Sequence, residues 1–67
     1  MKREKLIKKR EEKGYTQEQV ARAVGISKSH YSHIELGSRL PAYDIMMKIA
    51  NFFNVKPDYF FYNESLL

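Results

Sequence analysis

The 67-residue sequence contains no cysteine, which excludes disulfide bonds and thiolate metal sites. Its apolar runs are a few residues long, far short of the roughly 20 that a membrane-spanning helix needs. The basic N-terminus, MKREKLIKKR, is not followed by the apolar stretch of a signal peptide. We therefore expect a cytoplasmic protein, folded as a single domain over residues 1–67. A chain this short has little room for a deep catalytic cavity, which favours a binding module over an enzyme.

Positive charge is concentrated in the first part of the chain. Residues 1–39 contain ten Lys or Arg and five Asp or Glu, a net +5, whereas residues 40–67 contain two and three, a net −1. A basic half on a small domain is the charge distribution expected of a protein that binds a polyanion such as a nucleic acid. Many helical domains are basic for solubility alone, so charge by itself leaves the partner open.

The order of helix signals predicts two short helices joined by a tight turn. Thr16 at the N-cap and Gln19 at N3 form a capping box, and Gly25 ends the helix that follows. Ser27 is placed to cap the next helix. Two short helices with so brief a connection form the outline of a helix-turn-helix over about residues 16–36, whose second helix can enter the DNA major groove. An ordinary helical hairpin has a similar outline.

Three further helices are expected around this pair. Residues 3–13 contain good helix formers without Gly or Pro, and Gly14 is placed to end them. Residues 42–53 repeat apolar side chains at helical spacing. Pro57 and Asp58 favour the start of a last short helix. The sequence therefore predicts an all-α, compact five-helix domain, with a short C-terminal tail.

The segments GYTQEQVARAVGISKSHYSHIELGSRLP and IMMKIANFFNVKPDYFF resemble the phage repressor/Cro-type helix-turn-helix family, also called the xenobiotic-response-element type. The resemblance covers about residues 4–62 and implies a lambda-repressor-like domain that binds operator DNA, usually as a two-fold dimer. It implies a sequence-specific, double-stranded DNA-binding transcriptional regulator, a repressor acting as a homodimer on a palindromic operator. The alternative is a protein-interaction module, such as an antitoxin-like partner, that uses the same scaffold and binds DNA only incidentally.

The third helix is the one that reads bases in this family. Lys28, Ser29 and His33 match the family's base-reading positions, and Ser32 lies beside them. Helical geometry agrees, because at 100° per residue these four positions face away from Tyr31 and Ile34, the pair that must pack inward. Lys28 can donate to guanine O6 and N7, and His33 can donate to a purine N7 or to a phosphate.

Other polar residues are expected to contact the DNA backbone. Gln17 matches the family position that clamps a phosphate at the start of the second helix, where its amide and the free backbone N–H groups would act together. The remaining residues expected at the backbone are Thr16, Ser27, His30, Ser38 and Arg39.

Arg10 and Glu35 match an internal ion pair that joins the first and third helices in the family. A guanidinium fork on a carboxylate at the end of the reading helix would fix the angle of that helix. The alternative is two unrelated surface charges. The distinction matters because an exposed pair contributes about 0–1 kcal/mol, whereas removing one partner of a buried pair can cost about 3–5 kcal/mol.

Aromatic residues near the C-terminus are candidates for a dimer interface. A short helix buries one side only, so one or two of its rings should remain exposed, although closing a small core is a sufficient role for two of them. Such a dimer would hold two reading helices one turn of DNA apart, about 34 Å. The expected interface residues are Tyr59, Phe60, Phe61, Tyr62 and Leu66.

His30 and His33, three residues apart, raise the question of a metal site. Two ligands do not make a zinc site, and the sequence offers no cysteine and no third histidine. A nucleophile with its base, or a phosphate-binding loop, cannot be assembled from these residues either. We expect no metal, no cofactor, no small-molecule ligand and no membrane partner.

Overall fold

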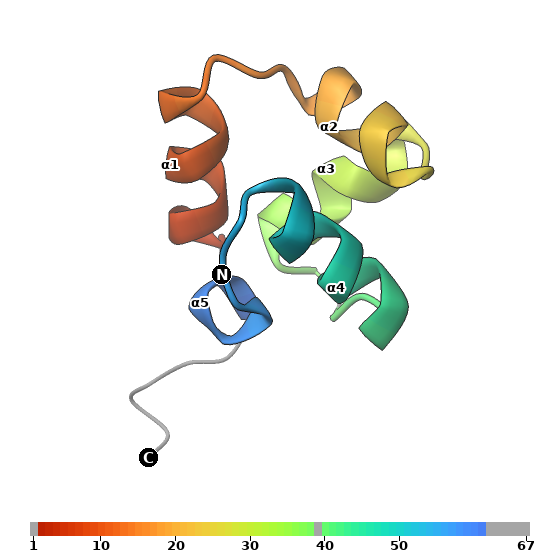
Figure 1. Ribbon diagram of the computed structural model, residues 1–67. Helices are drawn as coiled ribbons and strands as arrows, with labels where there is room; N and C mark the ends of the chain where they lie inside the picture. The colour runs from red at the N-terminus through yellow and green to blue at the C-terminus, as the bar shows by residue number, and fades with distance from the viewer. Residues whose placement is uncertain (1, 39, 62–67) are drawn as a thin grey trace.

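A computed structural model of the chain describes residues 2–38 and 40–61 (Figure 1). Over these residues the fold is all-α, so the prediction of a compact five-helix domain is confirmed. None of the helices described is both long and apolar enough to cross a membrane. The helices are α1 (Glu4–Glu12), α2 (Gln17–Val24), α3 (Lys28–Leu36), α4 (Tyr43–Phe52) and α5 (Pro57–Phe61).

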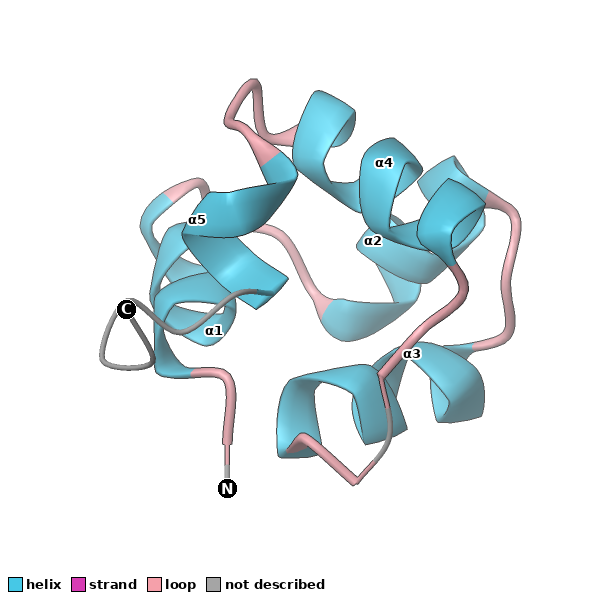
Figure 2. Cartoon of the chain, turned by 90° about the horizontal axis from the view of Figure 1, so that it is seen from below, coloured by secondary structure: helices cyan, strands magenta, loops and turns pink. Residues whose placement is uncertain are grey.

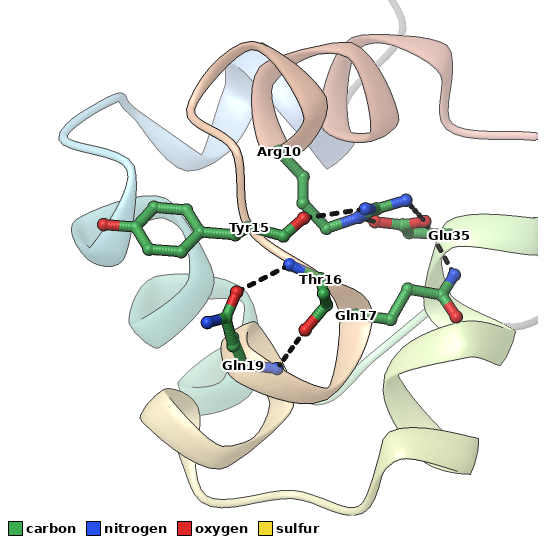
Figure 3. Close-up of polar contacts among 6 residues, drawn as sticks. All are labelled: Arg10, Tyr15, Thr16, Gln17, Gln19 and Glu35. Carbon is green, nitrogen blue, oxygen red and sulfur yellow. Dashed lines mark hydrogen bonds and ion pairs between the residues drawn. The ribbon is translucent and has the colours of Figure 1, made fainter.

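The start signals of α2 and α3 are present as hydrogen bonds. The backbone N of Gln19 donates to Thr16 Oγ1 at 3.1 Å, and the backbone N of Thr16 donates to Gln19 Oε1 at 2.8 Å, which completes the predicted capping box (Figure 3). At α3, the backbone N of His30 donates to Ser27 Oγ at 3.0 Å. Ala42 offers no side-chain cap to α4. Among α1 to α4, side-chain caps are therefore found at the two helices of the helix-turn-helix.

A left-handed residue ends α2 and starts the turn. Gly25 has φ +82°, a conformation that costs other residues about 1–2 kcal/mol. The next residue, Ile26, donates its backbone N–H to Ala21 O at 2.9 Å, which closes the end of the helix. Because Ala21 is small and buried, α3 can pack directly on α2. The turn and this small residue together set how the two helices cross.

The core lies where all five helices meet. α2 contacts α3 and α4, α1 contacts α3 and α5, and α4 contacts α5. In Figure 2, α3 lies at the edge of the molecule, with the other helices on one side of it. This arrangement buries one face of α3 and leaves the opposite face to solvent. The buried apolar residues are Leu6, Val20, Ala21, Val24, Tyr31, Ile34, Met46, Ile49, Ala50, Phe53, Phe60 and Phe61.

The rings of α5 complete this core. Phe60 and Phe61 are each 6% exposed, and their ring centroids lie 5.9 Å apart in an edge-on arrangement. They therefore offer almost no surface to a second chain, which corrects the expectation that they line a dimer interface. Of the expected interface, Tyr59 is 45% exposed, whereas Tyr62 and Leu66 lie outside the described residues.

Candidate nucleic-acid interface

α3 separates its side chains into a buried face and a polar, solvent-facing face. Tyr31 and Ile34 have no exposed surface and anchor the helix in the core. The opposite face contains the side chains that helical spacing directs outward, so the expected base-reading residues do share one accessible surface. We call this surface the polar face of α3, made up of Lys28, Ser29, His30 and His33, which are exposed, and Ser32, which is half-buried.

A buried ion pair holds the C-terminal end of α3 against α1. Arg10 Nε donates to Glu35 Oε2 at 2.7 Å, and Arg10 Nη2 donates to Glu35 Oε1 at 3.2 Å (Figure 3). The two side chains are only 13% and 3% exposed, so this is not a solvated surface pair. Arg10 Nη1 also donates to the carbonyl oxygen of Tyr15 at 2.9 Å. One guanidinium therefore ties together α1, the loop that leads into α2, and α3.

Gln17 adds α2 to the same cluster. Its Nε2 donates to Glu35 Oε1 at 2.9 Å (Figure 3). Sequence reasoning placed this amide on a DNA phosphate and did not foresee the intramolecular bond, since the two residues are 18 positions apart. An amide nitrogen has two hydrogens, so one remains for an external acceptor. The contact orients the amide at the start of α2.

The electrostatics of the cluster keep both partners charged. Burial by itself raises the pKa of Glu35, but the Arg10 hydrogen bonds, the nearby Tyr31 hydroxyl, the Gln17 amide and the Arg10 charge outweigh it, so the net pKa lies below the ordinary value. The hydrogen bond to Glu35 raises the pKa of Arg10. Burial, and then the Glu35 carboxylate, raise the pKa of the Tyr31 hydroxyl, which therefore stays protonated. Within the described residues that hydroxyl has no hydrogen bond of ordinary geometry, although it lies beside the pair.

Two hollows flank α3 and bring together residues from different elements. The first, of about 440 Å³, is lined by Thr16 and Gln17 at the start of α2 and by Lys28 at the start of α3. The second, of about 420 Å³, lies between the polar face of α3 and the loop that follows it, and is lined by His33 and Leu40 among others. The expected phosphate-contacting start of α2 thus adjoins the expected base-reading helix.

The loop after α3 contacts the helix through Ser38. Ser38 Oγ lies 3.3 Å from His33 Nδ1 and donates to the His33 carbonyl oxygen at 3.2 Å. Arg39, the other residue of this loop expected at the DNA backbone, lies outside the described residues. In the part of the chain that the structure describes, no group of three or more His, Cys, Asp or Glu residues is placed to hold a metal ion.

A capped helix, a left-handed glycine turn and an outward-facing second helix define a helix-turn-helix domain. The helix-turn-helix family matches residues 6–60, which is most of the chain. The chain belongs to the phage repressor/Cro-type helix-turn-helix family. This confirms the family that the sequence motifs indicated.

Individual relatives agree with this assignment. The uncharacterized HTH-type transcriptional regulator YqaE of Bacillus subtilis (strain 168) is 40% identical over 62 residues, which cover 92% of this chain and 53% of YqaE. The HTH-type transcriptional regulator ImmR of the same organism is 34% identical over 55 residues, covering 82% of this chain and 43% of ImmR. The chain therefore spans about half the length of either relative.

A solved structure of a restriction-modification controller protein has a similar fold. The restriction-modification controller protein C.AhdI from Aeromonas hydrophila superposes with a TM-score of 0.78 at 28% sequence identity. The match covers 87% of this chain and 88% of that one, so the five-helix arrangement is shared over nearly the whole domain.

Proposed function

We propose that this chain is a sequence-specific, double-stranded DNA-binding transcriptional regulator that represses as a homodimer on a palindromic operator. The observation that carries the proposal is the polar face of α3, held at a defined angle by the buried Arg10–Glu35 pair. A rigid helix at the edge of a domain can enter a major groove while its inner face remains packed in the core. The relatives' names, transcriptional regulators and a controller protein, support the same reading.

The proposed contacts divide into base-reading and backbone-binding residues. Lys28 would donate to guanine, with Ser29, Ser32 and His33 completing the base-reading set. Gln17 would use the amide hydrogen that Glu35 leaves free to bind a phosphate at the start of α2, where the backbone N–H groups also point outward. The other proposed backbone contacts are Thr16, Ser27, His30, Ser38 and Arg39.

The homodimer is proposed through the surface around Tyr59 and the residues that follow α5. Tyr59 is 45% exposed, and the ammonium of Lys5 lies 4.9 Å from its ring centroid. Two-fold pairing there would hold two copies of α3 about one DNA turn apart, roughly 34 Å. Sedimentation should show dimers at high micromolar concentration or on operator DNA. A monomer under both conditions would remove the homodimer from the proposal.

Selection from a pool of random duplexes tests the function directly. We expect the 67-residue chain to enrich a palindrome, with an affinity that falls steeply as salt rises, because phosphate contacts release counterions. Failure to enrich any sequence would instead favour a protein-interaction module on this scaffold.

Single substitutions then test the division of roles. Lys28→Ala and His33→Ala should change the selected sequence, whereas Gln17→Ala should weaken binding to all sequences alike. Lys56→Ala is a charge-matched control for Lys28→Ala, because Lys56 is exposed in the connection between α4 and α5 and has no proposed contact. Equal effects of Lys28→Ala and Lys56→Ala would mean that overall charge, not α3, drives binding.

A further inference from the structure

We propose that Ser38 fixes the tautomer of His33, so that Nδ1 carries the proton and Nε2 presents a lone pair to the DNA. His33 then reads the amino group of adenine or cytosine instead of donating to a purine N7. The base-reading half of this inference rests on the proposed function. The tautomer itself is a property of the free protein.

The geometry starts with the end of α3. Gly37 has φ +77°, which turns the chain back so that Ser38 lies over the last turn of the helix. There the backbone N of Ser38 donates to His33 O at 3.3 Å. The hydroxyl of Ser38 donates to the same carbonyl oxygen at 3.2 Å, and its oxygen lies 3.3 Å from His33 Nδ1. One hydroxyl thus faces an acceptor and a ring nitrogen at once.

Counting hydrogens gives the tautomer. A serine hydroxyl has a single hydrogen, and a carbonyl oxygen can only accept. If that hydrogen points at His33 O, the Ser38 oxygen must accept from Nδ1–H. The reverse arrangement, with the hydroxyl donating to Nδ1, would leave two acceptor oxygens 3.2 Å apart with no hydrogen between them, on a carbonyl that also accepts from the backbone N–H groups of Gly37 and Ser38. The hydrogen bond made by one ring nitrogen fixes the state of the other, so Nε2 of the neutral ring is an acceptor.

Nε2 is the nitrogen that DNA would meet. It points away from Ser38, and within the described residues it has no hydrogen-bond partner. In the major groove, adenine N6 and cytosine N4 are donors, whereas guanine N7 and O6 and thymine O4 are acceptors. An acceptor at this position therefore favours adenine or cytosine. Lys28, on the same face of α3, can only donate hydrogen bonds and therefore favours a base that offers acceptors, such as guanine.

NMR of the free, full 67-residue chain tests the tautomer without DNA. At about pH 8, where imidazole is ordinarily neutral, the 15N signal of His33 Nδ1 should have a protonated, pyrrole-like shift and Nε2 a pyridine-like shift. Ser38→Ala should raise the share of the Nε2–H form, and Ser38→Thr, which keeps the hydroxyl, should restore the wild-type pattern. A wild-type ring protonated mainly at Nε2 would overturn the proposal.

DNA binding tests whether His33 reads a base. The position to examine is the operator base pair at which His33→Ala weakens the sequence preference. There the wild type should accept A and C together on one strand and discriminate against the other pairs by about fivefold or more. Acceptance of A and G together would indicate donation to N7 and would overturn the reading role. Where a single pair is accepted, 7-deaza-purine, which lacks N7, should leave affinity unchanged; a loss would count against the proposal.

Ser38→Ala separates the positioning role of Ser38 from a simple phosphate contact. Ser38→Ala should reduce the ratio between the affinities for the preferred and the disfavoured base pairs at that position, and Ser38→Thr should retain that ratio. A uniform loss of affinity with an unchanged ratio would mean that Ser38 only binds the backbone, which contradicts the proposal. If no DNA sequence is selected at all, the proposed function fails, and the NMR measurement still decides the tautomer.

Discussion

Replacing Arg10 should destabilise the domain far more than replacing a surface cation. Arg10→Met removes two hydrogen bonds to Glu35 and one to the Tyr15 carbonyl. It leaves the Glu35 carboxylate, on a side chain that is 3% exposed, with only the Gln17 amide as a strong donor. Removing one partner of a buried pair costs about 3–5 kcal/mol. We expect about 3 kcal/mol, the lower end, because Arg10 itself keeps some contact with water.

That loss is large for a domain of this size. At about 0.05–0.15 kcal/mol per residue, a 67-residue chain has a free energy of unfolding of roughly 3–10 kcal/mol. Arg10→Met should therefore remove between a third and all of it. The double variant Arg10→Met/Glu35→Leu should recover most of the loss, because exchanging a buried ion pair for apolar residues of similar volume is often neutral or stabilising.

Urea denaturation followed by far-UV circular dichroism at neutral pH measures these differences. The control is Arg22→Met, which breaks an exposed pair with Glu18 at 3.5 Å and should cost at most a few tenths of a kcal/mol. The reasoning would be refuted if Arg10→Met cost less than about 1 kcal/mol, or if the double variant were as unstable as Arg10→Met. Either result would mean that Glu35 is not held as a buried charge.

Three further changes follow from the same contacts. The pKa of Glu35 is lower in the folded than in the unfolded chain, so its stabilising effect is present above about pH 4.5 and is lost at lower pH. The difference in free energy of unfolding between wild type and Glu35→Gln, measured by urea titration, should therefore shrink as acid is added. Thr16→Ala should cost about 1 kcal/mol by removing the acceptor of the capping box, and Thr16→Ser should retain the stability in thermal melts. Gly25→Ala should cost about 1–2 kcal/mol from its φ of +82° alone, since nothing lies within 4 Å of the added Cβ; an unchanged melting temperature would argue against the left-handed turn.

Local signals in the sequence were sufficient for the helices and for the orientation of α3. The capping box at Thr16, the cap at Ser27 and the left-handed glycines depend on residues within one helical turn of each other, so spacing alone predicts them. The inward direction of Tyr31 and Ile34 follows from the 3.6-residue repeat. The pairing of Arg10 with Glu35 came from family resemblance, and its geometry and burial came from the structure.

Contacts between elements were decided only by the tertiary structure. Gln17 reaches Glu35 because of how α2 crosses α3, and no local spacing encodes a bond between residues 18 positions apart. Phe60 and Phe61 are buried because α5 packs against α1 and α4, whereas the sequence of α5 by itself left both the core and an interface open to them. The contact of Ser38 with His33 depends on how the chain leaves Gly37, which neither residue type indicates. The sequence by itself determined which face of α3 is polar, and packing decided how that face is held and which atoms it presents.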